Sequence, residues 1–224
     1  LGLGDTVSVT MEDMIHHGAA VARGAKNALV VVDMPFMSYQ SSVYDAVVNA
    51  GRLMKEARAN AVKLEGGVEV ADRIRAIVYC QIPVCAHIGL TPQGINALGG
   101  FKVQGKTADS ARKLLEDAHA VEEAGAFAVV LEAIPAELAA RVSAELTIPT
   151  IGIGAGAGCD GQVLVNQDML GMFHDFTPKF VRRFAEVGDV MLDAYRAYDA
   201  AVKDGTFPAA EHTYAAPAGV LETL

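Results

Sequence analysis

The sequence contains no tryptophan, only three cysteines and no apolar run of the ~18 residues that a membrane span requires. It also lacks a long run of either charge, and the net charge is −9, from 18 Lys and Arg against 27 Asp and Glu. These features argue against nucleic acid or a membrane as the main partner. The first residues show no charged-then-apolar signal pattern, so we expect a cytoplasmic protein.

The cysteines Cys80, Cys85 and Cys159 form an odd set without CxxC spacing. Such a set indicates neither a disulfide framework nor a zinc site. Cys85 falls in an apolar strand pattern, which favours a small buried hydrophobic residue over a nucleophile.

What is present is an aliphatic α/β pattern of 224 residues, 52% of them hydrophobic. We expect a single domain over residues 1–212 and a flexible C-terminal tail over residues 213–224. Strand patterns alternate with helix patterns along the chain. The expected strands are 28–33, 61–65, 83–87, 126–132, 149–154 and 162–169, and the expected helices are 11–23, 42–57, 70–78, 109–124, 136–146 and 179–203.

The segment Ala61-Val-Lys-Leu-Glu-Gly-Gly67 organises the rest of the chain. Side chains alternate along a strand, so Lys63 and Glu65 share one face. The two glycines then end the strand and allow close backbone approach, which puts the charged pair at its C-terminal end. In parallel α/β folds, active-site residues lie at the C-terminal ends of the strands. A structural salt bridge between Lys63 and Glu65 is the alternative.

Three other expected strands end in an ionisable side chain, at Asp33, His87 and Glu132. Regular βα alternation fits either an open doubly wound sheet or a (β/α)8 barrel, and charged ends that converge on one mouth favour the barrel. A barrel has eight strands and about 250 residues. With six strands expected here, we expect the first one or two β-strands of the barrel to be absent from the chain before Leu1.

A long polar and glycine-rich connection over Thr91–Thr107 follows the third expected strand. A connection of this length inside a compact domain is usually functional, and we expect a lid or binding loop. Each ionisable strand end also has a structural interpretation: Asp33 and Glu132 could cap helices, and His87 could be a buried core histidine.

Several segments in one order resemble the ketopantoate hydroxymethyltransferase family, and the resemblance extends from about Asp5 to His212. They are Asp33-Met-Pro-Phe-Met37, Val62-Lys-Leu-Glu-Gly-Gly67, His87-Ile-Gly-Leu-Thr-Pro-Gln93, Gly99-Gly100 with Lys102-Val-Gln-Gly105, Leu131-Glu132 before Pro135, and Ile151-Gly-Ile-Gly-Ala-Gly156 before Asp160-Gly-Gln162.

The resemblance implies a (β/α)8 TIM barrel of the phosphoenolpyruvate/pyruvate superfamily that forms a homo-oligomer, typically a decamer. It implies transfer of a one-carbon unit from 5,10-methylenetetrahydrofolate to 3-methyl-2-oxobutanoate with Mg2+. The product would be 2-dehydropantoate, on the route to pantothenate and coenzyme A.

Residue by residue, the resemblance implies Asp33 and Glu65 as metal ligands and Asp33, Lys63 and His87 as substrate-binding residues. Glu132 would be the catalytic proton acceptor. The family also has a Gly-Asp-Ser segment, whose Asp binds magnesium and whose Ser contacts the keto acid, at a point that would precede Leu1.

Two other classes of function stay open. A related barrel enzyme, such as an oxo-acid lyase or phosphonomutase, would use similar carboxylates and magnesium, but generally with a cysteine or other acid on a mobile loop. The loop at 91–107 carries no such residue. A catalytically incomplete structural subunit is the second alternative.

Overall fold

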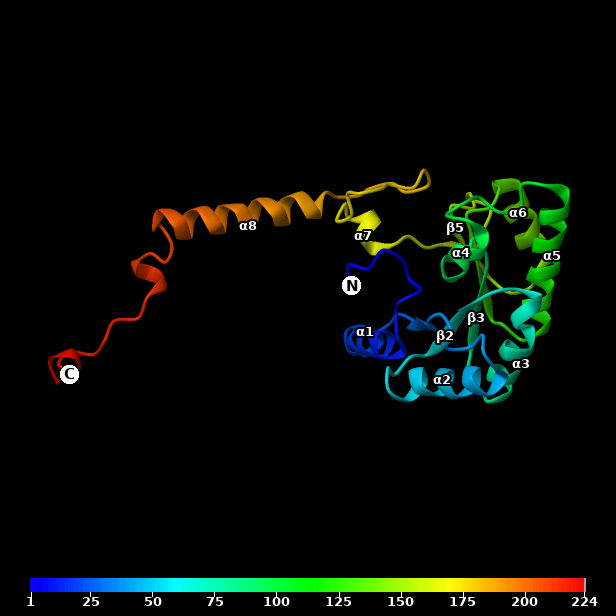
Figure 1. Cartoon of the computed structure of the whole chain (residues 1–224), viewed down its shortest axis with the longest axis horizontal. Helices are drawn as coiled ribbons and strands as arrows, with labels where there is room; N and C mark the ends of the chain where they lie inside the picture. The colour runs from blue at the N-terminus through cyan, green and yellow to red at the C-terminus, as the bar shows by residue number, and fades with distance from the viewer. Residues whose placement is uncertain (224) are drawn as a thin grey trace. The chain divides into compact units, whose positions relative to one another are not determined.

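The structure is a computed structural model that describes residues 1–223. Contacts divide the chain into two compact units, residues 1–163 and residues 164 onward, which are described separately. The first unit contains a six-stranded sheet with the helices that cover it (Figure 1). Its elements are α1 Met11–Gly24, β1 Val31–Asp33, α2 Val43–Lys55, β2 Ala61–Glu65, η1 Val68–Val70, α3 Ala71–Tyr79, β3 Val84–Gly89, η2 Pro92–Gly94, α4 Ile95–Leu98, α5 Ala108–Glu123, β4 Ala128–Glu132, α6 Ala136–Glu145, β5 Thr150–Ile153 and β6 Gly161–Gln162.

The six strands are all parallel and follow one another across the sheet in chain order, β1 to β6. A doubly wound sheet would reverse its strand order at a switch point. The unbroken order, together with the curl of the sheet, is that of a half-barrel, and it confirms the predicted barrel-type fold.

The two faces of the sheet differ in chemistry. One face presents aliphatic side chains such as Val62, Leu64 and Val129 to the helices, and these residues belong to the large core cluster. Figure 1 shows α2, α3, α5 and α6 along this outer side. The opposite face carries only a small apolar cluster that includes Cys85 and Val130. The ionisable strand ends lie on this second face.

Cys85 is buried, as predicted for a hydrophobic position, and burial raises the pKa of its thiol to about 11. All three cysteines are free.

Local sequence explains where the helices begin. Thr10 caps α1 by accepting a hydrogen bond from the Asp13 backbone N–H, and the Asp13 carboxylate accepts one from Thr10 N in return. This reciprocal capping box satisfies two backbone donors that have no partner within the helix. The predicted start of this helix is therefore confirmed.

The predicted sixth strand over 162–169 is wrong. Only Gly161–Gln162 pairs with β5, and Asn166–Met169 forms the short helix α7. The aliphatic residues Val163 and Val165 are exposed, and the polar Asn166-Gln167-Asp168 that follows is poor strand sequence. The short apolar run therefore does not form a strand, and the polar segment after it is helical.

The predicted start of the last long helix at Lys179 is also wrong, because α8 spans Val187–Asp204. Instead, Phe184 N donates to Met169 O at the end of α7, and Val187 N, at the start of α8, donates to Leu170 O just after α7. These tertiary bonds replace the intrahelical ones. The second unit also contains η3 Ala210–His212 and η4 Leu221–Thr223.

Among residues 1–223, no helix combines the length and the apolar character needed to cross a membrane.

Candidate active site

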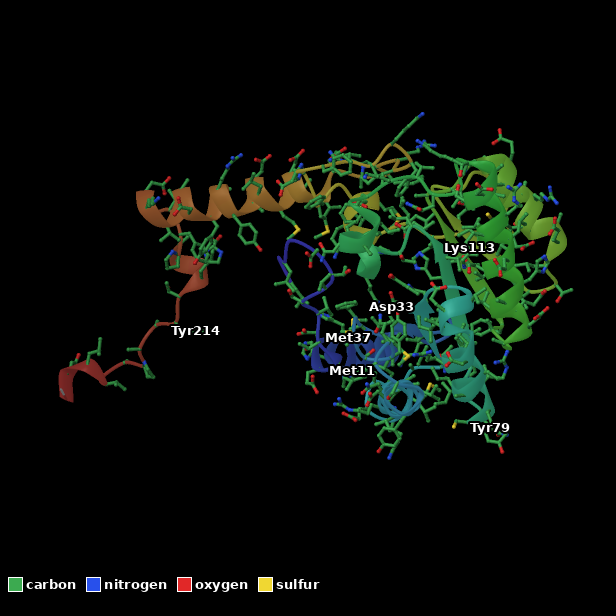
Figure 2. The ribbon with its side chains drawn as sticks, turned by 45° about the vertical axis from the view of Figure 1, so that its right-hand side comes forward. Met11, Asp33, Met37, Tyr79, Lys113 and Tyr214 are labelled. Atoms are coloured by element: carbon green, nitrogen blue, oxygen red, sulfur yellow. The ribbon has the colours of Figure 1, made fainter. Side chains whose placement is uncertain are left out.

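The C-terminal ends of β1 to β4 bring the predicted site residues onto one face of the sheet. Asp33 lies beside Lys63 in the β1–β2 register, and Glu65 lies beside His87 in the β2–β3 register. Glu132 lies beside Gly89, two residues beyond His87. Figure 2 labels Asp33 near the middle of the first unit and Tyr79 at its outer edge, and the Asp33 side chain is 41% exposed.

The side chains form a continuous polar chain across four strands. Lys63 Nζ lies 2.9 Å from Asp33 Oδ2 and 3.0 Å from His87 Nδ1. On its other side, His87 Nε2 lies 3.1 Å from Glu132 Oε2 and 3.0 Å from Leu90 O. Four of the five predicted residues are therefore in direct contact.

His87 is neutral in this arrangement. Burial, followed by the charge of Lys63, lowers the pKa of His87 to about 3. Since Lys63 can only donate, His87 Nδ1 must accept, and Nε2 then carries the proton and donates to Leu90 O, with Glu132 Oε2 as a close neighbour at 3.1 Å. Because the imidazole is neutral, its 3.1 Å contact with Glu132 is a close polar contact and not an ion pair.

Lys63 remains charged although it is largely buried. Burial alone would lower the pKa of Lys63, but the negative charges of Asp33 and Glu65 outweigh burial and raise it. An ammonium group has three donors. Asp33 and His87 take two of them, so the third can serve a bound anion.

Glu132 and Glu65 are both unusually basic carboxylates. Burial raises the pKa of Glu132 to about 7, against the opposing effect of Lys63. Burial likewise raises the pKa of Glu65 to about 7, with further increments from the like charges of Asp33 and Glu132. A carboxylate with a pKa near neutrality is suited to accept a proton from a weak acid.

Glu65 is held by two residues to which the sequence had assigned no role, Tyr39 and Gln93. Gln93 N donates to Glu65 Oε2 at 2.9 Å, and Glu65 N donates to the Tyr39 hydroxyl at 3.1 Å. Gln93 falls within the connection that was predicted to be functional, which is a weak signal for it. Nothing in the local pattern around Tyr39 distinguishes it.

The connection over Thr91–Thr107 contains two helical turns, η2 and α4, and then extends. Gln104 N donates to Ala133 O at 2.9 Å, which ties its far end to the residue after Glu132. The connection therefore starts and ends beside the site. Its role as a lid stays a prediction.

The donors present suit magnesium. Asp33 and Glu65 offer hard carboxylate oxygens on one face, although the described residues hold no group of three or more His, Cys, Asp or Glu side chains arranged around a metal. Mg2+ in proteins is commonly held by one or two carboxylates and completes its shell with water and substrate oxygens. Two carboxylates are thus a sufficient protein contribution.

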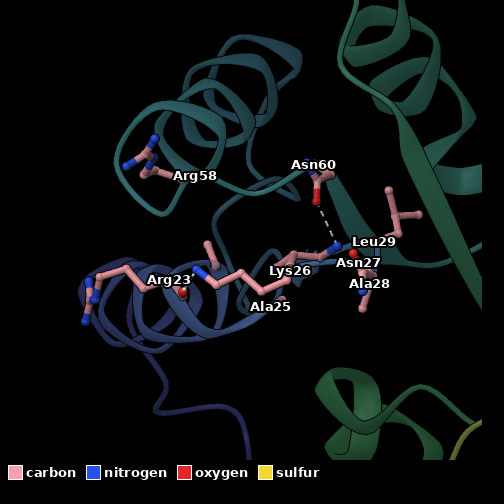
Figure 3. Close-up of a pocket in the computed structure, with 10 residues that line it drawn as sticks. Arg23, Ala25, Lys26, Asn27, Ala28, Leu29, Arg58 and Asn60 are labelled. Carbon is pink, nitrogen blue, oxygen red and sulfur yellow. Dashed lines mark hydrogen bonds between the residues drawn. The ribbon is translucent and has the colours of Figure 1, made fainter.

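A wide cavity in the first unit lies elsewhere. A volume of about 730 Å³ opens before β1 and β2, at the opposite end of the strands, with Arg23, Lys26, Arg58 and Asn60 among its lining residues (Figure 3). Asn60 Oδ1 accepts a hydrogen bond from Val30 N at 2.9 Å there. None of the predicted site residues lines this cavity, so its size does not make it the site.

Comparisons with known proteins indicate one enzyme family. The family model described as ketopantoate hydroxymethyltransferase matches residues 1–210. Relatives named 3-methyl-2-oxobutanoate hydroxymethyltransferase, from Clostridium novyi (strain NT) and from Enterococcus faecalis, are each 66% identical over 224 residues. Each alignment covers 100% of this chain and 82% of the relative.

Two solved structures share the fold. 2,3-dimethylmalate lyase, a member of the PEP mutase/isocitrate lyase superfamily, has a TM-score of 0.55 at 17% identity, covering 95% of this chain and 73% of that protein. Phosphonopyruvate hydrolase has a TM-score of 0.52 at 13% identity, and the match covers 97% of this chain and 75% of that protein. At such low identity these likenesses concern the fold alone.

Proposed function

Because the chain belongs to the ketopantoate hydroxymethyltransferase family, we propose that it transfers a hydroxymethyl group to 3-methyl-2-oxobutanoate and forms 2-dehydropantoate. The one-carbon donor is 5,10-methylenetetrahydrofolate, and the product leads to pantothenate and coenzyme A. Full-length relatives of that name support this reaction over an oxo-acid lyase or a purely structural subunit.

The reaction begins with loss of a proton from C3 of the keto acid. Glu132 accepts this proton, and the C–H electron pair moves into the adjacent carbonyl to form an enolate. His87 Nε2 lies 3.1 Å from Glu132 Oε2, so a neutral polar group sits beside the carboxylate. The contact with His87 restricts how the carboxylate can turn.

Lys63 binds the developing negative charge. Its third N–H donor is directed by the contacts with Asp33 and His87, so the ammonium is already oriented before substrate arrives. His87 and Asp33 complete the substrate-binding side of the site. Asp33 and Glu65 would hold Mg2+, which when bound supplies Lewis-acid stabilisation of the enolate oxygen.

Carbon–carbon bond formation completes the transfer. The methylene carbon of the folate is bonded to two nitrogens, and both carbon–nitrogen bonds break as this carbon gains a bond to the enolate C3 and a hydroxyl from water. The two nitrogens take up the C3 proton, returned by Glu132, and one proton of the water, so that tetrahydrofolate and 2-dehydropantoate are the products. The connection over Thr91–Thr107 is where we expect bulk water to be excluded.

The observation that carries this proposal is the chain of contacts from the half-exposed Asp33 through the largely buried Lys63 and His87 to Glu132, which joins a fixed cation to a base with a raised pKa. The test is consumption of 3-methyl-2-oxobutanoate with and without methylenetetrahydrofolate, and with Mg2+ or EDTA. Turnover that requires both folate and metal supports the proposal. Carbon–carbon cleavage without folate would indicate a lyase, and no turnover would indicate a structural subunit.

Assembly into a homo-oligomer, with ten copies as the expected number, and a cytoplasmic location are part of the same proposal. So is the division into a catalytic domain over 1–212 and a flexible tail over 213–224. Analytical ultracentrifugation of the full chain measures the first of these directly.

A further inference from the structure

Three separate segments meet at Glu65 through buried hydrogen bonds. Tyr39 comes from the segment after β1, Glu65 ends β2, and Gln93 follows β3. Tyr39 is fully buried, with 0% of its surface exposed, and Glu65 and Gln93 are each 8% exposed. Nearly all polar atoms of this cluster must therefore find partners within the protein.

The Gln93 side chain is held at both ends of its amide. Nε2 donates to Met34 O at 2.8 Å, and Oε1 accepts from the Tyr39 hydroxyl at 2.9 Å and from Gln40 Nε2 at 3.2 Å. With the side chain fixed, the Gln93 backbone N–H has a defined direction, and it donates to Glu65 Oε2.

These bonds connect the surroundings of both proposed metal carboxylates. Met34 directly follows Asp33, and Gln93 binds its carbonyl oxygen. The same glutamine binds the Glu65 carboxylate, while the Tyr39 hydroxyl accepts from the Glu65 backbone. One buried network thus joins the ends of β1 and β2, in addition to the backbone bond from Met34 N to Lys63 O.

We propose that Tyr39 and Gln93 are positioning residues that fix the direction of the Glu65 carboxylate and its separation from Asp33, an inference that rests on the proposed function. Neither side chain is among the predicted ligands or bases. Their action is indirect, through Glu65, and the network also anchors the start of the Thr91–Thr107 connection to the site.

Two variants test this from opposite sides of the network. Tyr39→Phe keeps the ring and removes only the hydroxyl, and Gln93→Leu removes the amide but keeps the backbone N–H. We expect each variant to weaken Mn2+ binding by the full chain, measured by electron paramagnetic resonance without substrate, by about 10- to 100-fold. In the crystal structure of the Tyr39→Phe variant, Glu65 Oε2 should leave Gln93 N.

Thr150→Val is the matched control, because Thr150 is also fully buried and its hydroxyl bonds to Ser143 and Asp160 on the outer, helix-covered side. It should lose thermal stability but keep Mn2+ affinity within about twofold, against the 10- to 100-fold expected above. Equal weakening by Thr150→Val, or unchanged affinity in both network variants, would overturn the inference.

The outcomes remain separable from those of the proposed function. A wild-type chain that does not turn over tests the function, whereas Mn2+ binding and the variant structure require no turnover. If the wild-type chain binds no Mn2+, the crystal structure decides: a Glu65 carboxylate still bonded to Gln93 N in the Tyr39→Phe variant overturns the inference, and a displaced one supports it.

Discussion

At the scale of single residues, Glu132 combines burial with a neutral polar neighbour, His87. Replacement by Gln keeps the shape and the contact with His87 but removes the proton acceptor. We expect Glu132→Gln to slow exchange of the C3 proton of 3-methyl-2-oxobutanoate in D2O by about 10²- to 10⁴-fold, as followed by NMR. Glu137→Gln, an exposed residue on α6, is the control and should exchange at the wild-type rate. Equal rates in both variants would assign the base elsewhere.

The raised pKa of Glu132 also predicts how stability depends on pH. Its ordinary value is 4.5 and burial raises it to about 7, so the folded state binds the proton more tightly than the unfolded state. The resulting stabilisation is complete below about pH 4.5 and is lost as the pH rises through about 7.

Glutamine at this position does not titrate, so the variant does not lose stability in this way as the pH rises. The Tm of the Glu132→Gln variant should therefore increase relative to wild type between about pH 5 and pH 8, measured by calorimetry in EDTA. Glu65 titrates in both proteins, but without the like charge of Glu132 its raised pKa falls in the variant, and this change increases the stability of the variant over the same pH range. A Tm difference that does not change with pH would contradict the raised pKa.

At the scale of elements, the close approach of β3 and β4 depends on Gly89. Its φ is +93°, and a Cβ there would overlap the carbonyl oxygen of Glu132. We expect Gly89→Ala to destabilise the fold by about 1–3 kcal/mol in urea unfolding and to displace the end of β4 with its carboxylate. The rate of C3 proton exchange should fall as well, because Glu132 would be displaced.

Gly51→Ala is the opposite case within the same unit. Gly51 lies inside α2, and nothing lies within 4 Å of a Cβ placed there. Alanine favours a helix interior over glycine by about 0.5–1 kcal/mol, so this variant should gain stability and keep full activity. A similar loss in both variants would mean that crowding at Glu132 is not the cause.

The elements that could be predicted from sequence are those whose signals are local. The strand Ala61–Glu65 has the predicted bounds, because alternation defines its faces and two glycines end it. The cap at Thr10 is equally local. The segments after Gln162 and Lys179 were misassigned because their backbone partners, on β5 and α7, are set by tertiary contacts.

The candidate site likewise contains residues that the sequence could predict and residues that it could not. Ionisable residues at strand ends could be found because parallel strands in a barrel converge by topology. The hydrogen bond between Tyr39 and Gln93 joins residues 54 positions apart, each in a connecting segment. No periodic pattern encodes that meeting, so only the folded chain shows it.

At the scale of the whole molecule, the two units differ in how much they bury. The first contains the continuous aliphatic core, whereas α8 in the second has no buried residue among those described. Local opening is easiest where few apolar contacts must be broken. In dilute protein, hydrogen exchange should therefore be faster in α8 than in β2, β3 and β4.

The same measurement reports on self-association. Tyr195 and Tyr198 of α8 are both strongly exposed, at 66% and 60%. If copies of the chain assemble over this helix, its exchange should slow as the protein concentration rises, while β3 stays unchanged. Exchange in α8 as slow as in β3 at every concentration would contradict the predicted difference between the units.

The alternation that directs aliphatic side chains to one face and ionisable ones to the other has a consequence for folding fidelity. A strand paired one residue out of register would turn its charged side chain into the helix-covered layer. An unpaired charge buried there carries a penalty of several kcal/mol. Chains with mispaired strands are thereby disfavoured while they fold, so the groups proposed for catalysis also select the correct register.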